Sequence, residues 1–193
     1  TFSLANADVV LHGIGFEDHA GRQFASAGDV DGDGKGDLLV GARFNSDTVL
    51  NGGTAYLLLG STLLAGGASL AAADTTFTAT ATQQRVGSAV SSAGDVDGDG
   101  LDDVLIGAFG DEEGGEFAGK VFVFLGSSLT SGTMSVDTAD AAFVGEAAGD
   151  TVASMLCPGG DVDGDGLDDL VFGAWGRWSP LAEAGRTYVL LSP

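Results

Sequence analysis

Regularly spaced aspartates are the residues of this sequence best suited to chemistry. They occupy positions one, three, five and nine of a nine-residue segment that occurs three times. Calcium prefers six to eight oxygen ligands at about 2.3–2.6 Å, and a carboxylate at every second residue lets a loop wrap around one such ion. We therefore expect three Ca²⁺ ions per chain, one in each loop. The predicted carboxylate ligands are Asp29, Asp31, Asp33 and Asp37; Asp95, Asp97, Asp99 and Asp103; and Asp161, Asp163, Asp165 and Asp169.

The seventh residue of each segment completes the predicted ligand set. Leu101 and Leu167 can offer only a backbone carbonyl there, as expected for this position of a calcium loop, and Lys35 holds the position in the first copy. The second and third copies also carry Asp102 and Asp168 at position eight. We expect both of these aspartates to face solvent.

Other interpretations of the segments are less favourable. An EF-hand needs a bidentate glutamate at position twelve, where this sequence has Val40, Ile106 or Phe172. Magnesium prefers a rigid octahedron that retains several waters, and zinc would need clustered Cys and His. The aspartates could instead cap turns through local hydrogen bonds. Because uncompensated carboxylates in each segment would repel one another, we favour a bound cation.

The segments belong to a longer repeat of 66 residues. The heptapeptide GDVDGDG begins at Gly28, Gly94 and Gly160, and apolar runs follow each copy in the same register. These runs are short, rich in Val, Leu, Phe and Tyr, and bounded by glycine, which is typical of strands. Four strands per repeat are predicted, the number found in a propeller blade. The predicted strands lie around Phe24, Val90 and Val152, at 38–42, 104–108 and 170–174, at 53–59, 119–125 and 185–191, and at 9–11, 76–78 and 142–144.

The repeat resembles the FG-GAP repeat of integrin α-subunit propellers. The resemblance rests on Gly87-Ser88 and on residues 93–100, 103–108 and 119–126, with equivalents in the other copies. One departure is Val86, which precedes Gly87 where the family has Phe. The resemblance implies calcium between the first and second strands of each blade and a ligand surface on the opposite face. The expected fold is therefore all-β, a β-propeller with four-stranded antiparallel blades, three of them in this chain.

The number of blades bears on assembly. We interpret residues 1–193 as one propeller array, with repeats at about 9–60, 76–126 and 142–193. Known propellers close with about four to eight blades, so three are too few. Because an outer strand is predicted near Val9 and the last blade lacks one, two copies could close a six-bladed ring by exchanging the N-terminal strand. We favour this homodimer over a fragment of a longer propeller.

The charge of the chain restricts its partners. Seven Lys and Arg against 28 Asp and Glu give a formal net charge of -21, which repels phosphate backbones and anionic membrane surfaces. We therefore expect no nucleic-acid partner. No stretch approaches the roughly 18 apolar residues of a membrane span. Loops rich in carboxylates suit millimolar calcium, so we expect an extracellular or periplasmic protein.

The loops between the second and third strands differ most among the repeats, and such variable loops are where recognition usually occurs on a repeated scaffold. Their aromatic and cationic residues could form a surface for a protein or carbohydrate ligand, or could pack over the blade ends. We find no catalytic constellation, so we expect a recognition, adhesion or scaffold module; a propeller-fold hydrolase or a lectin is the alternative. The candidate ligand-binding residues are Arg43, Phe44, Phe109, Trp175, Arg177 and Trp178.

Overall fold

Short strands make up most of the regular structure in the computed structural model, which describes residues 4–64, 69–176 and 185–193. The strands are β1 (Gln23–Gly28), β2 (Asp37–Ala42), β3 (Thr54–Leu58), β4 (Thr75–Thr78), β5 (Val86–Gly94), β6 (Asp103–Ala108), β7 (Lys120–Phe124), β8 (Gly132–Ser135), β9 (Ala141–Val144), β10 (Val152–Pro158), β11 (Leu170–Ala174) and β12 (Arg186–Leu190). The helical segments are α1 (Gly60–Leu64) and the 3-10 turns η1 (Leu4–Asn6), η2 (Leu70–Ala72), η3 (Gly126–Ser128) and η4 (Val136–Thr138). The chain is therefore mostly β, as the sequence predicts.

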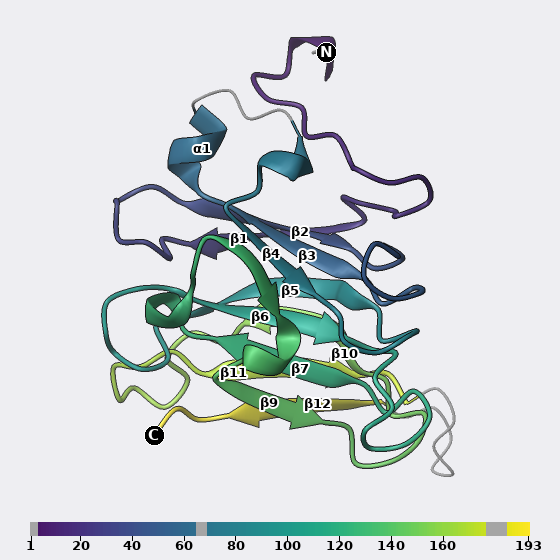
Figure 1. Ribbon diagram of the computed structural model, residues 1–193. Coiled ribbons are helices and arrows are strands. Elements are labelled where there is room, and N and C mark those ends of the chain that lie inside the picture. The colour runs from purple at the N-terminus through teal and green to yellow at the C-terminus, as the bar shows by residue number, and fades with distance from the viewer. Residues whose placement is uncertain (1–3, 65–68, 177–184) are drawn as a thin grey trace.

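The strands form three sheets; in Figure 1 the first lies above the other two, which overlap in this view. The first sheet has the order β1-β2-β3-β4-β8, the second β5-β6-β7-β9, and the third β10-β11-β12 over the described residues. Neighbouring strands are antiparallel except β4 and β8, which are parallel. Strand β5 contacts β1 of the first sheet and β10 of the third. This arrangement is consistent with consecutive propeller blades.

Two apolar cores hold the sheets together. Between the first and second sheets, Leu39 and Phe77 pack with Ile106 and Phe122. The second core joins the middle sheet to the third sheet through Leu105, Val121, Leu170 and Phe172. Every residue of β6 is buried, because other sheets cover both faces of the middle sheet. That double burial explains why β6 is a continuous apolar run rather than an alternating one.

The fourth strand of each of the first two sheets comes from the chain that follows the sheet's first three strands. Strand β4 pairs with β3 and β9 pairs with β7, so the strands predicted at 76–78 and 142–144 are confirmed. The strand predicted at 9–11 is wrong, because these residues form no strand. The edge of β3 is already occupied by β4, and Leu11 packs instead against the buried cluster that contains Leu70 on the outer face of the first sheet.

The sequence pattern does not predict β8. This strand lies in the connection between β7 and β9, which crosses back from the second sheet to pair with β4 of the first. Thr75 Oγ1 donates a hydrogen bond to the carbonyl oxygen of Thr130 at 2.8 Å, in the same connection. The crossing covers the outer edge of the first sheet, and a covered edge is protected from pairing with other chains.

Each of the first two sheets approaches the next sheet closely at a glycine in its second strand, Gly41 or Gly107. A β carbon added at Gly41 would lie 2.1 Å from the carbonyl oxygen of Gly87 in the next sheet. The equivalent residue of the third sheet, Gly173, would instead meet Met155 of its own sheet at 3.5 Å. The contact between the first two sheets therefore depends on the absence of a side chain.

Replacing Gly41 by Ala is expected to destabilise the protein by roughly 3 kcal/mol, because the added methyl group would collide with backbone that cannot rotate away. Gly173→Ala is the matched control and should cost less than about 1 kcal/mol. Urea unfolding of both variants would measure the difference. Equal unfolding midpoints would contradict the close packing of the first two sheets.

Candidate metal centre

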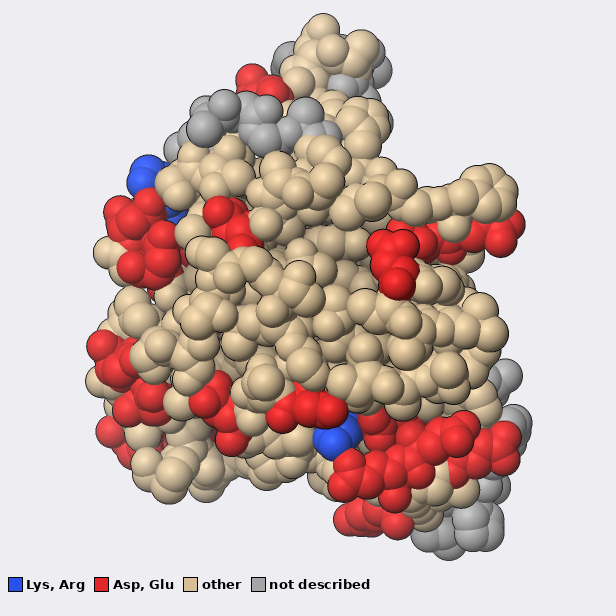
Figure 2. Space-filling view, viewed as in Figure 1, with Lys and Arg blue, Asp and Glu red and all other residues tan. Residues whose placement is uncertain are grey.

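The aspartate segments form the turns that join β1 to β2, β5 to β6 and β10 to β11. Acidic side chains gather along the left edge of Figure 2, the side on which these turns lie in Figure 1. In each loop, three carboxylates place ligand oxygens within 4.8 Å of one another. The three groups are Asp29, Asp31 and Asp33; Asp95, Asp97 and Asp99; and Asp161, Asp163 and Asp169.

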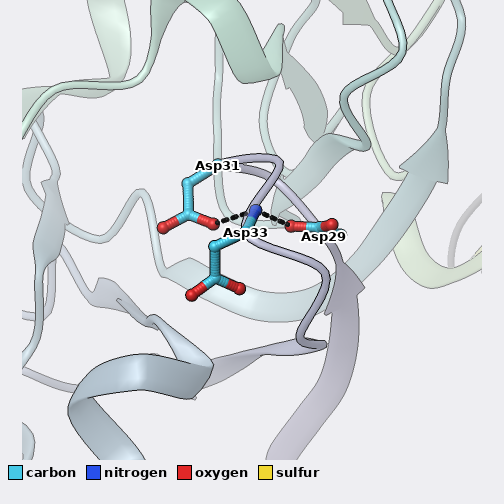
Figure 3. A group of neighbouring side chains, drawn as sticks. All are labelled: Asp29, Asp31 and Asp33. Atoms are coloured by element: carbon cyan, nitrogen blue, oxygen red, sulfur yellow. Dashed lines mark hydrogen bonds between the residues drawn. The ribbon is translucent and has the colours of Figure 1, made fainter.

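Backbone amides orient the carboxylates of the first loop (Figure 3). Asp33 N donates to Asp29 Oδ1 and to Asp31 Oδ1, both at 3.1 Å, and Gly34 N donates to Asp29 Oδ2 at 2.8 Å. The same three bonds recur in the other two loops at 3.0–3.2 Å. Gly34 has a φ of +81°, which glycine adopts without strain. The oxygens are thus arranged in advance, which lowers the entropic cost of binding an ion.

The aspartate at position nine is buried. Its carboxylate accepts hydrogen bonds from two backbone amides, one in its own loop and one outside the loop. Asp103 is 0% exposed; its Oδ2 accepts from Val96 N at 2.8 Å, and its Oδ1 accepts from Gly126 N at 2.7 Å. Asp37 and Asp169 form the equivalent pairs of bonds. Burial raises the pKa of Asp103 to about 6, against the two backbone hydrogen bonds, which lower it. Each oxygen keeps a second lone pair, so this residue can also offer an oxygen to a cation.

We expect the calcium-free protein to lose stability as the pH rises from about 5 to about 7.5. The pKa of Asp103 is 3.8 when unperturbed and about 6 in the fold, so the folded state holds this proton more tightly than the unfolded state. Deprotonation over this range should cost about 1 kcal/mol. Urea unfolding in chelator at both pH values would measure the loss. The difference should shrink in Asp103→Asn; an unchanged difference would assign the effect to other groups.

The residues at positions seven and eight form an ion pair in the first loop and hydrogen bonds between loops. Lys35 forms an ion pair with Asp33, and this hydrogen bond lowers the pKa of Asp33. The prediction that Asp102 and Asp168 face solvent is wrong. Both are half-buried, because the carboxylate of each accepts a hydrogen bond from the loop of the preceding repeat. The ligand role of the carbonyl at position seven stays a prediction.

The opposite ends of the strands carry a cluster of arginine and aromatic side chains. The guanidinium carbon of Arg43 lies 4.8 Å from the centre of the Phe44 ring and 5.9 Å from that of Phe109. Arg85 lies 5.3 Å and 5.0 Å from the same two rings and 5.7 Å from the ring of Phe117. The structure therefore brings three predicted ligand-surface residues together and adds two others. Phe117 lies within a variable loop and could have been found there, but Arg85 lies in a different connection that reaches the same end of the sheets.

Trp175 lines a separate depression. Its side chain is 71% exposed, and together with Met155 and Gly173 it borders an open hollow of about 620 Å³ on the third sheet. Arg177 and Trp178 lie outside the described residues. Among the described residues, the contacts between arginines and aromatic rings come from the first two repeats.

Comparison with known proteins identifies the repeat. Residues 20–58 and 86–124 match the family model described as the FG-GAP repeat, and each matched segment contains one aspartate loop. This chain carries FG-GAP repeats. It is 34% identical to integrin alpha-IIb of Homo sapiens over 155 residues, 31% identical to integrin alpha-IIb of Mus musculus over 173, and 31% identical to integrin alpha-5 of Xenopus laevis over 166. These alignments cover 77%, 86% and 85% of this chain but 14%, 16% and 15% of the relatives, respectively.

The FG-GAP chain thus spans about one-seventh of the length of these integrins, to which its similarity is distant. FG-GAP and integrin-like modules are generally non-catalytic. In the parts of the chain that the structure describes, no helix combines the length and hydropathy that crossing a membrane requires.

Proposed function

We propose that this chain is a calcium-stabilised recognition, adhesion or scaffold module. The observation that carries the proposal is the set of three carboxylate clusters, which join positions one, three and five in the first two loops and positions one, three and nine in the third. Donor sets made only of oxygen fit calcium, whereas zinc sites use Cys and His. Integrin-like FG-GAP domains are typically extracellular, and these loops suit millimolar calcium, so the proposed location is extracellular or periplasmic.

Each ion would be held by the carboxylates at positions one, three, five and nine, with the backbone carbonyl at position seven. Three divalent ions would change the formal charge of the chain from -21 to -15. Calcium would thereby relieve repulsion within each loop and tie two strands together at their turn. Because the unfolded chain has no such loops, ion binding would stabilise the fold.

Calorimetric titration with calcium chloride tests this function. We expect three ions to bind per wild-type chain and two per chain in the double variant Asp97→Asn and Asp99→Asn. The matched control is Glu112→Gln with Glu116→Gln, which removes two exposed charges outside the loops and should leave three ions bound. A wild-type chain that binds no calcium, or binds magnesium equally well, would overturn the proposal.

A second observation supports recognition on the face opposite the calcium loops. Burial lowers the pKa of Arg43, and so do the positive charges of Arg22 and Arg85. The buried Nε of Arg43 has no hydrogen-bond partner among the described residues. Arg43 and Arg85 therefore lie beside aromatic rings, with the charge of Arg22 acting on Arg43, in a chain whose net charge is -21. Such a surface suits a ligand that brings a carboxylate, which arginine binds through two parallel hydrogen bonds.

Titrations with a glutamate-rich peptide and with polygalacturonate, followed by NMR, would separate a protein ligand from a carbohydrate. Binding should shift the signals of Arg43 and Phe109, and Arg43→Gln should weaken it roughly tenfold. Arg186→Gln, on the third sheet, is the control and should leave binding unchanged. Binding of polygalacturonate alone would favour the lectin alternative, and its cleavage would favour the hydrolase alternative. A lack of response to either probe would contradict an anionic ligand at this surface.

Completion of the array by a second copy stays a prediction. The third sheet has three strands over the described residues, so a fourth strand from another chain could pair with β12. For residues 9–11 to supply it, Leu11 would have to leave its contacts on the first sheet. Sedimentation in calcium should then give twice 19.1 kDa. A monomeric mass at all concentrations would contradict the homodimer.

A further inference from the structure

The eighth residue of one loop is bonded to the first residue of the loop before it. Asp102 Oδ2 accepts a hydrogen bond from Asp29 N at 2.7 Å, and Asp102 N donates to the carbonyl oxygen of Asp29 at 3.1 Å. One residue of the second repeat therefore holds both backbone polar groups of a predicted calcium ligand in the first. We call this pair of hydrogen bonds the inter-loop link.

The inter-loop link recurs between the second and third repeats. Asp168 Oδ2 accepts from Asp95 N at 3.0 Å, and Asp168 N donates to the carbonyl oxygen of Asp95 at 3.0 Å. In both links the partners are 73 residues apart. A β carbon at Gly28 or Gly94 would lie 2.2 or 2.0 Å from the linking carboxylate, so glycine is required before each linked aspartate. The same contact made twice is a feature of the repeat rather than an accident of one loop.

Position seven adds an apolar contact to each link. A β carbon at Gly32 of the first loop would lie 3.1 Å from the side chain of Leu101, and one at Gly98 of the second loop would lie 3.0 Å from that of Leu167. The two leucines thus lie against the loop of the preceding repeat. Each loop that is followed by another repeat is therefore covered on one side by a Leu-Asp pair.

The third loop lacks the link, although its sequence is the same as that of the second. Residues 94–103 and 160–169 both read GDVDGDGLDD. A β carbon at Gly160 would meet no atom within 4 Å, and none of the described residues forms a hydrogen bond with Asp161 N. The second and third loops therefore differ in their tertiary contacts and not in their residues.

We propose that Asp102 and Asp168 are positioning residues that raise the calcium affinity of the loop before each of them. The linked residues, Asp29 and Asp95, stand at position one, where the carboxylate also accepts amide hydrogen bonds inside the loop. Holding the backbone N–H and carbonyl of this residue restricts the directions its carboxylate can take, so less conformational entropy is lost when an ion binds. Calcium binding in one repeat is thereby coupled to the packing of the next repeat.

The inference rests on the proposed calcium function and predicts an order of affinities. Because a hydrogen bond to a charged group contributes enough free energy for about a tenfold change in an equilibrium constant, the second loop should bind calcium roughly tenfold more tightly than the third. Their identical sequences make this comparison a control within the wild-type chain. The comparison uses the wild-type chain alone, so its outcome does not depend on whether any variant folds.

An NMR titration of the full chain with calcium can resolve the three loops. The amides of Gly34, Gly100 and Gly166 each donate to the position-one carboxylate of their own loop, so each signal reports one site. In the wild type, the midpoint for Gly166 should lie at roughly tenfold higher calcium than that for Gly100. Equal midpoints for these two glycines would overturn the inference.

Substitution of Asp102 tests the coupling across repeats. Asp102→Ala should move the Gly34 midpoint to roughly tenfold higher calcium and leave Gly100 unchanged, although Asp102 belongs to the loop of Gly100. Asp102→Asn retains an acceptor oxygen and should keep most of the affinity. The matched control is Gly36→Asp, which adds a carboxylate at position eight of the first loop, in open space, and should shift Gly34 by less than about twofold.

Each outcome has a distinct meaning. An unchanged Gly34 midpoint in Asp102→Ala, or a shift at Gly100 instead, would overturn the coupling. If Asp102→Asn weakened binding as much as Asp102→Ala, the effect would come from charge and the positioning role would be wrong. If none of the three glycines responded to calcium in the wild type, the calcium function itself would fail.

Discussion

Removal of calcium with excess chelator is expected to lower the midpoint of thermal unfolding by roughly 15–30 °C. Extracellular calcium modules bind with dissociation constants of about 10⁻⁴ M, so about 10 mM calcium would exceed the dissociation constant 100-fold. The first two loops then stabilise the fold by about 2.7 kcal/mol each and the third, binding about tenfold more weakly, by about 1.4 kcal/mol, which gives about 7 kcal/mol together. For a domain of this size, 1 kcal/mol corresponds to about 2–4 °C. Calorimetry or circular dichroism with and without chelator would measure the shift.

The structural reason for this effect is the crowding of carboxylates within each loop. Each loop places three carboxylates within 4.8 Å of one another, and these clusters lie along one side of the molecule (Figure 2). Without a cation, the repulsion between them opposes the folded state. The double variant Asp97→Asn and Asp99→Asn should therefore show about two-thirds of the wild-type shift. A chain whose unfolding midpoint does not respond to chelator would exclude a structural role for the metal.

The second large effect is expected from Asp103→Ala, which should destabilise the calcium-free protein by roughly 2–5 kcal/mol. The substitution leaves Val96 N and Gly126 N without the carboxylate that accepts from them, and each buried donor that loses its acceptor costs about 1–3 kcal/mol. Measurement in chelator is essential, because it removes any contribution from lost calcium binding. Urea unfolding would give the free energy directly.

Asp97→Ala is the matched control for this substitution. Asp97 belongs to the same loop but is exposed, and its carboxylate accepts one bond, from Asp99 N at 3.1 Å. Its loss should change the stability in chelator by less than about 1 kcal/mol, and could raise it by removing a repelling charge. If the two alanine variants unfolded at the same urea concentration, position nine would have no structural role beyond that of a metal ligand.

The repeat, the loops and most strands follow from local sequence. A run such as Val104 to Ala108 is short, apolar and rich in β-branched residues, which is typical of a buried strand. The aspartates at alternate positions of 29–33 converge because the loop amides bind their carboxylates within a few residues. These interactions span no more than about nine residues, so the spacing of residue types is enough to indicate them.

Contacts between repeats were decided by the tertiary structure. Residues 9–11 have the composition of a strand but form none, whereas the short run at 132–135 becomes a strand because it meets the edge of β4. The link between Asp29 and Asp102 joins residues 73 positions apart. The strand at 132–135 and the link between Asp29 and Asp102 do not depend on the local sequence alone, since each forms only when a partner distant in the sequence lies beside it.

The second and third aspartate loops show this limit most directly. Their ten residues are identical, so the sequence by itself determines that both loops can bring carboxylates together. The carboxylates that converge are Asp95, Asp97 and Asp99 in the second loop but Asp161, Asp163 and Asp169 in the third. In the structure, Asp95 of the second loop has a partner, Asp168. The backbone N–H of Asp161 in the third loop has none among the described residues. Local residue types set which atoms can bind a cation, but the packing of one sheet on the next determines how firmly those atoms are held, because hydrogen bonds form only where the fold brings donor and acceptor together.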